Sequence, residues 1–205
     1  MQAVITGDIV NSTRLAAAKE KKLRKVLTDL FRNARFEFYR GDSFQVFLKN
    51  PLEALRLALL CRTAAISMGK GDKTTMTDIR LSIGVGMVNA PVRELRTSGG
   101  EAFLLSGRSF DEIAKTGRHL AITTGNALAN EGLQVISDYL NAIFKAMSGK
   151  QAEVIYEMLN GEMQQAVAKK FKKTKSTIHQ RLISGHWPEI ENLLQHYENI
   201  IKQLS

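Results

Sequence analysis

The chain has 205 residues and is basic, with 29 Lys and Arg against 20 Asp and Glu and a net charge of +9, which favours an anionic partner. Its 44% hydrophobic and 24% charged residues are typical of a globular protein of one large or two small domains. A lone cysteine excludes a disulfide framework, and four scattered histidines argue against a structural zinc site. Without an apolar run of about 18 residues or a signal-peptide pattern, we expect a cytoplasmic protein with no membrane partner.

The first two elements are predicted to be a strand and a helix. The apolar run over residues 3–10 is broken at Asp8, which indicates a strand that ends in a turn. Residues 11–31 carry apolar side chains at helical spacing, and Ser12 or Thr13 is the candidate N-cap.

A hairpin and a second helix follow. Two short apolar runs over residues 36–48 flank Arg40 and Asp42, which indicates a β-hairpin with an aspartate directly after its turn. Alternation in the second run predicts Phe44 and Val46 on one face of the sheet and Gln45 and Phe47 on the other. Asn50 as N-cap and Pro51 at the first helical position then predict the start of a helix.

The next strand, over residues 78–88, completes a βαββαβ order, which is that of a ferredoxin-like sheet. In that topology the first two strands run the same way, so Asp8 and Asp42 are expected at one edge of the sheet. Two carboxylates there suit Mg²⁺ or Mn²⁺, and the helix after Asp8 offers free N–H groups to phosphates. Alternatively, both aspartates serve only as turn residues with no joint role.

The elements after residue 88 complete a predicted division of the chain into three parts. We expect a helix from about residue 106 to 115, a strand over residues 118–124 and a long helix over residues 126–147. From residue 148 the sequence changes to short helices with a basic cluster. The predicted division is 1–125 for the sheet domain, 126–147 for a connecting helix and 148–205 for a helical domain.

Four segments of the first domain carry a resemblance. In this order, "GDIVNSTRL", "RGDSFQVFLKNPLEALRLALLC" and "RLSIGVGMV" resemble the palm of class III nucleotidyl cyclases, and more specifically the SatD family of bacterial proteins, which also carry a GDxFQ hairpin. "GGEAFLLSGRSFDEIAK" resembles the SatD segment after the last palm strand. The resemblance implies a cyclase-like palm in which Asp8 and Asp42 are the metal-binding aspartates.

The resemblance also locates two departures. The position of the base-reading lysine of cyclases carries Phe38, and that of the transition-state asparagine carries Leu104, while Arg108 matches the transition-state arginine. Losing one such donor typically lowers the rate about 10²- to 10³-fold, which favours a sensor over a catalyst. Four residues are candidates for phosphate or nucleotide binding: Ser12, Thr13, Arg40 and Arg108.

The C-terminal part has the spacing of a helix-turn-helix. Helices are predicted over residues 150–159, 163–171 and 175–184, with Thr174 as the N-cap of the third. The phrasing of this stretch resembles region 4 of bacterial sigma factors and the related LuxR-type domains. The alternative is a three-helix scaffold with a solvated basic face.

Basic residues gather on the second helix, the turn and the third helix, where they could neutralise DNA phosphates. Polar residues of the third helix could read base edges, with Gln180 suited to adenine and Lys175 to guanine. The candidate DNA-binding residues are Lys169, Lys170, Lys172, Lys173, Lys175, Ser176, Thr177, His179, Gln180 and Arg181.

The final helix, from Pro188, repeats apolar residues every three or four positions, which fits either packing on the sheet domain or a homodimer seam. Together these features predict an α+β protein, a ferredoxin-like, cyclase-like palm joined to a helix-turn-helix. We expect a DNA-binding transcriptional regulator whose palm senses a nucleotide or metal–phosphate ligand. The alternative is a divergent nucleotidyl cyclase or phosphoryl-transfer enzyme whose C-terminal helices serve dimerisation.

Overall fold

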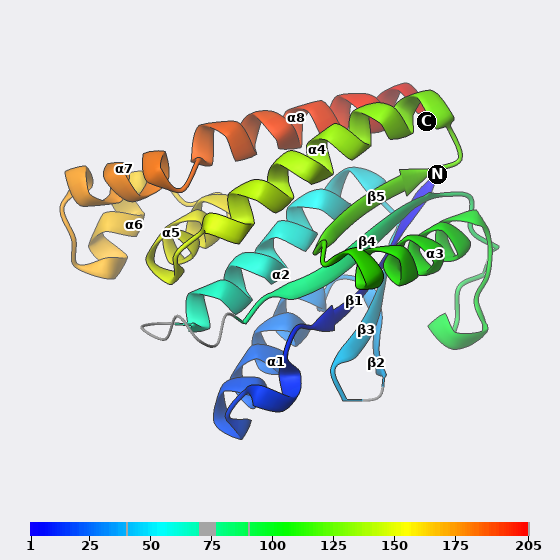
Figure 1. Ribbon diagram of the computed structural model, residues 1–205, viewed down its shortest axis with the longest axis horizontal. Coiled ribbons are helices and arrows are strands. Elements are labelled where there is room, and N and C mark those ends of the chain that lie inside the picture. The colour runs from blue at the N-terminus through cyan, green and yellow to red at the C-terminus, as the bar shows by residue number, and fades with distance from the viewer. Residues whose placement is uncertain (40, 70–76, 90, 205) are drawn as a thin grey trace.

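The computed structural model of the chain describes residues 1–39, 41–69, 77–89 and 91–204, and it is a mixed α+β structure (Figure 1). A five-stranded sheet carries helices on both faces, and further helices extend from one side of it. No helix of the described residues combines the length and the apolar character that a membrane span requires.

The strand order confirms the predicted βαββαβ arrangement. The strands are β1 (Gln2–Ile9), β2 (Arg35–Tyr39), β3 (Ser43–Leu48), β4 (Ile79–Gly86) and β5 (Leu120–Thr124), arranged β2-β3-β1-β4-β5. β1 lies antiparallel between β3 and β4, so β1 and β2 run the same way, as expected. β5 adds a parallel neighbour to β4.

Alternation along the strands divides the sheet into an apolar and a partly polar face. Phe44 and Val46 belong to the main core with α1 and α2, whereas Phe47 joins Val4 in a smaller cluster beneath α3. Gln45 reaches the hydroxyl of Thr6 on this second face. The alternation predicted for the hairpin is therefore confirmed.

Of the helix starts predicted around the sheet, one is wrong and one is confirmed. They are α1 (Ala17–Phe31), α2 (Ala54–Met68), α3 (Glu101–Thr116) and α4 (Ala127–Ala146). The N-cap prediction at Ser12 or Thr13 is wrong, because residues 12–14 form a short 3-10 turn, η1, and α1 starts three residues later. Asn50 does cap the 3-10 turn η2 (Pro51–Glu53) that leads into α2, since its side chain accepts from the Leu52 amide.

The C-terminal helices are α5 (Gly149–Leu159), α6 (Gln164–Phe171), α7 (Lys175–Ser184) and α8 (Trp187–Leu204). Two of these four helices, α5 and α8, pack against the helices that cover the sheet, while α6 and α7 pack on α5 and α8 (Figure 1). α5 lies along α2, α8 lies along α4, and one cluster of buried apolar side chains continues from the sheet into all four. Buried Tyr197 of α8 donates to the Pro51 carbonyl at 2.7 Å. Of the two uses considered for the final helix, packing on the sheet region is therefore present, and a homodimer stays a prediction.

Candidate functional site

Asp8 and Asp42 lie next to each other at one edge of the sheet. Asp8 is the last but one residue of β1 and pairs with Ser43, the first residue of β3. The amide of Ile9 donates to the carbonyl of Asp42 at 3.2 Å. The β1–β3 register therefore brings together the two aspartates that the sequence predicted to meet.

The carboxylate of Asp8 is held by an arginine that sequence reasoning missed. Arg80 of β4 lies directly opposite Asp8 and donates to both of its oxygens, at 3.1 and 2.7 Å. Its guanidinium also lies 5.5 Å from the ring centre of Phe110 on α3. Both partners are partly buried, with side chains 23% and 18% exposed, so the ion pair is shielded from full solvation. A charged residue inside an apolar strand was the available signal.

The carboxylate of Asp42 is held by hydroxyl groups. Ser12 donates to one oxygen at 2.7 Å, and Ser43 approaches the other at 3.4 Å. Ser12 thus contacts the site as a hydrogen-bond donor rather than as a helix cap. Arg40, the predicted phosphate ligand in the hairpin, lies outside the described residues.

The other predicted ligands of this site do not converge on it. Thr13 is exposed in η1, and Arg108 is exposed on α3. Neither makes a hydrogen bond or ion pair to Asp8 or Asp42 in the described part of the chain. Phe38, at the base-reading position, packs with Phe31 and Phe44 on the opposite, apolar face of the sheet.

The charges around Asp8 are unfavourable for a divalent cation. Arg80 donates to both oxygens of Asp8, which leaves each oxygen a further lone pair but places a positive charge directly beside the carboxylate. Among the described residues, no group of three or more His, Cys, Asp or Glu side chains gathers closely enough to hold a metal. The guanidinium of Arg80 would repel a cation at Asp8, and the predicted Mg²⁺ or Mn²⁺ site stays a prediction.

A second charged cluster at this edge lies inside the protein. Arg62 of α2 is 1% exposed and donates to both oxygens of Asp78, at 3.1 and 2.7 Å. Nδ1 of His119 lies 2.6 Å from the same carboxylate, and Asn141 of α4 accepts from the His119 amide. The sequence signal was Arg62 itself, a charge within an otherwise apolar helical run.

Opposing effects act on the pKa of Asp78. Burial by itself raises it, but the charge of Arg62 and the hydrogen bonds from His119 and Arg62 outweigh burial and lower the pKa below its ordinary value. The carboxylate is therefore ionised in the folded protein and neutralises Arg62. With the arginine stacked 4.4 Å from the Phe144 ring centre, the cluster ties α2, β4 and α4 together.

The second candidate site is the surface formed by α6, residues 172–174 and α7. Val167 and Ala168 of α6 are buried, and so are Ile178 and Leu182 of α7. The Thr174 hydroxyl accepts from the Thr177 amide at 3.1 Å, which confirms Thr174 as the N-cap of α7. Lys172 turns the chain between the helices with a left-handed backbone, at φ 51°.

Most of the predicted DNA-binding side chains are exposed on this surface. The exposed ones are Lys169, Lys170, Lys172, Lys173, Lys175, Ser176, His179 and Gln180, while Thr177 and Arg181 are half-buried. Lys170 differs, because its ammonium donates to Glu157 of α5 at 2.7 Å, and this contact raises its pKa. Lys170 therefore points back toward α5 and is engaged within the protein.

Comparisons with solved structures find chains of similar fold. A solved chain described as "Structure of a bacterial light-regulated adenylyl cyclase" superposes with a TM-score of 0.44 at 16% sequence identity, covering 60% of this chain and 74% of that chain. No protein-family model matches the chain. No curated protein matches it either.

Proposed function

We propose that the protein is a DNA-binding regulator that contacts DNA through α6, residues 172–174 and α7. The observation that carries the proposal is the surface on which exposed basic side chains surround the turn while the apolar sides of both helices are buried. No acidic residue occurs between residues 163 and 188, so nothing in this stretch opposes a polyanion. A three-helix scaffold with a solvated basic face would have the same helices and turn, so the DNA titrations below separate the two.

The exposed residues divide into two roles under this proposal. Lys169, Lys172 and Lys173 surround the turn and would neutralise phosphates, which fixes the position of the module. Lys175, Ser176, His179 and Gln180 share the exposed side of α7 and would face base edges in the major groove.

Fluorescence anisotropy with labelled duplex DNA at several salt concentrations tests the proposal. The logarithm of the affinity should fall linearly with the logarithm of salt, because each phosphate contact releases counterions. Lys172→Glu plus Lys173→Glu should weaken binding and reduce the salt slope by about 2.

Two control variants make this test specific. Lys21→Glu plus Lys25→Glu makes the same charge change on exposed positions of α1 and should affect DNA affinity far less. Lys170→Gln removes a lysine that is engaged with Glu157, and it should weaken DNA binding less than Lys169→Gln. An affinity that is independent of salt, or equal losses in the turn and α1 doubles, would refute DNA binding through this surface.

We further propose that residues 1–125 form the cyclase-like palm of a SatD-type protein and sense a nucleotide or metal–phosphate ligand. The adjacency of Asp8 and Asp42 at one sheet edge supports this part. Thermal unfolding with Mg²⁺ or Mn²⁺, with and without a nucleotide panel, would show a shift that Asp42→Asn removes. No shift with any nucleotide would leave α6 and α7 to carry the function.

The same adjacency favours one alternative, a phosphoryl-transfer enzyme or divergent nucleotidyl cyclase. Product formation from a nucleoside triphosphate with Mn²⁺, abolished by Asp42→Asn, would establish that alternative. Phe38, which packs in the apolar core, and the ion pair of Asp8 with Arg80 favour the sensor.

A further inference from the structure

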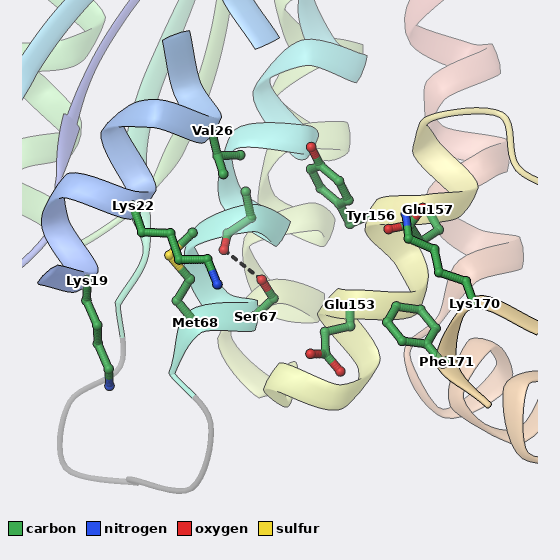
Figure 2. Close-up of a pocket in the computed structure, with 11 residues that line it drawn as sticks. Lys19, Lys22, Val26, Ser67, Met68, Glu153, Tyr156, Glu157, Lys170 and Phe171 are labelled. Carbon is green, nitrogen blue, oxygen red and sulfur yellow. Dashed lines mark hydrogen bonds and ion pairs between the residues drawn. The ribbon is translucent and has the colours of Figure 1, made fainter. Parts of the chain in front are cut away.

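A cleft of about 620 Å³ opens between the sheet region and the C-terminal helices (Figure 2). Its walls come from α1, the C-terminal end of α2, α5 and the C-terminal end of α6. The volume lies within the range of small-molecule sites, which is about 300–1,000 Å³. It shares no lining residue with the Asp8–Asp42 edge.

The interior of the cleft is largely apolar. Ala64 is buried, and Val26, Met68, Tyr156 and Phe171 are half-buried around it. Figure 2 shows the Phe171 ring turned toward the opening from the side of α6. Half-buried apolar side chains that line one hollow leave surface that a second apolar group could cover, and covering it would be favourable.

The acidic residues that line the cleft have interaction partners, whereas two of its lysines have none among the described residues. On the α5 side, Glu157 is paired with Lys170 at 2.7 Å, and Glu153 also takes part in an interaction. On the α1 side, Lys19 and Lys22 are exposed and make no ion pair or hydrogen bond among the described residues. Figure 2 shows the ammonium group of Lys22 extended over Met68 toward Ser67. The cleft therefore offers cations on one rim that have no acidic partner within the described parts of the chain.

We infer that this cleft binds a small amphipathic anion, a carboxylate or sulfonate with an aromatic or aliphatic body. Lys19 and Lys22 receive the anionic head, and the body lies on Val26, Met68 and Phe171. A cationic ligand is disfavoured, because both acidic residues of the lining already interact within the protein. A polyanion is disfavoured too, because only two lining lysines, Lys19 and Lys22, are left without an ion pair among the described residues. This inference does not depend on DNA binding.

The test is a titration of the full-length protein with 8-anilinonaphthalene-1-sulfonate, followed by fluorescence, with decanoate as competitor. We expect saturable binding of one probe molecule, displaced by decanoate more effectively than by decylamine or decan-1-ol. Displacement by decylamine as effective as by decanoate would overturn the assignment of an anionic head group.

Two sets of variants locate the probe. Lys19→Gln plus Lys22→Gln should raise the dissociation constant about fivefold, as expected for two lost contacts of exposed charges. Lys21→Gln plus Lys25→Gln makes the same charge change on exposed positions of α1 outside the cleft and should leave binding within about twofold of wild type. Equal effects of the two doubles would overturn the site.

A variant that fills the cleft gives an independent test of the site. Ser67 lines the cleft and is half-buried, so Ser67→Trp would place an indole ring where the ligand body is expected. Probe binding should be lost while the far-UV circular dichroism and the cooperative unfolding transition remain. Undiminished probe binding by this folded variant would show that the probe sits elsewhere and would refute the inference. Should Ser67→Trp fail to fold, the two lysine doubles decide the question.

Discussion

At the scale of single residues, Asp78 shows how burial and pairing act together. Its carboxylate is enclosed with Arg62, whose side chain is 1% exposed. A buried ion pair contributes little net stability by itself, but removing one partner leaves the other charged and uncompensated. Removing one partner of the pair should therefore destabilise the fold far more than the intact pair stabilises it.

Asp78→Asn should lower the free energy of unfolding by about 3–5 kcal/mol, because Arg62 would remain buried without its counter-charge. Urea unfolding at pH 7 measures this loss. Asp138→Asn is the matched control, because Asp138 is 45% exposed and pairs with exposed Arg118. We expect a loss of less than about 1 kcal/mol there. Similar losses in both variants would contradict the role of burial.

The same cluster predicts a pH dependence of stability. Because the folded pKa of Asp78 lies below its unfolded value of about 3.9, its stabilisation is complete above that unfolded value. It is lost as the pH falls through the lower, folded pKa. Urea unfolding across pH 7 to 2.5 should show wild type losing stability below about pH 4 more steeply than Asp78→Asn. Parallel curves would mean that Asp78 titrates alike in the folded and unfolded chains.

At the scale of elements, the packing of α3 on β4 depends on one glycine. A Cβ atom built at Gly84 would lie 2.5 Å from the Ser106 amide nitrogen and closer still to the carbonyl oxygen of Ala102. Backbone atoms of a helix cannot yield as a flexible side chain can. Gly84 therefore sets how closely α3 approaches the sheet, and with it where Ser106 meets Thr6 of β1.

Gly84→Ala should lower the free energy of unfolding by about 1–3 kcal/mol through this overlap. Gly107→Ala, within α3 itself, is the contrasting control, because a Cβ there meets nothing within 4 Å. It should raise stability by about 0.5–1 kcal/mol, since alanine is the better helix former. Thermal or urea unfolding measures the stability of both variants. If Gly84→Ala also raised the free energy of unfolding, α3 would have to shift to make room for the added Cβ atom.

At the scale of the whole molecule, the buried apolar cluster extends from the sheet through α2 into α5 and α8. The hydrogen bond from Tyr197 to the Pro51 carbonyl links the last helix to the start of α2. Because this core is shared, the C-terminal helices have no separate hydrophobic core of their own. The sheet region and the helices are therefore expected to unfold together.

Trp187, the single tryptophan, is 8% exposed at the start of α8 and reports on this region. Its fluorescence and the far-UV circular dichroism should give coincident urea transitions. By both probes, Tyr197→Phe should lower the free energy of unfolding by the same amount, about 0.5–1.5 kcal/mol, because one of the two hydrogen bonds to the Pro51 carbonyl is lost while that from the Ala54 amide remains. Two separate transitions would show that the C-terminal helices form an independent unit.

The sequence alone determined features that depend on near neighbours in the chain. The caps at Asn50 and Thr174, the alternation of Phe44 and Val46 and the order of helices and strands follow from local spacing, which the backbone period converts directly into a face. Even the adjacency of Asp8 and Asp42 followed from the strand order. Ser12 was misassigned as the N-cap because residues 12–14 form η1, and its hydroxyl instead donates to Asp42 in a distant segment.

Only the tertiary structure decided which side chains meet across long stretches of sequence. Asp8 pairs with Arg80, 72 residues away, and Tyr197 bonds to Pro51 across 146 residues. Lys170 remains exposed, but its ammonium pairs with Glu157 of α5. Such contacts depend on the register of strands and the angles of packed helices, which no local period encodes. They determine which charges are already satisfied, and hence which of them are left to bind a partner.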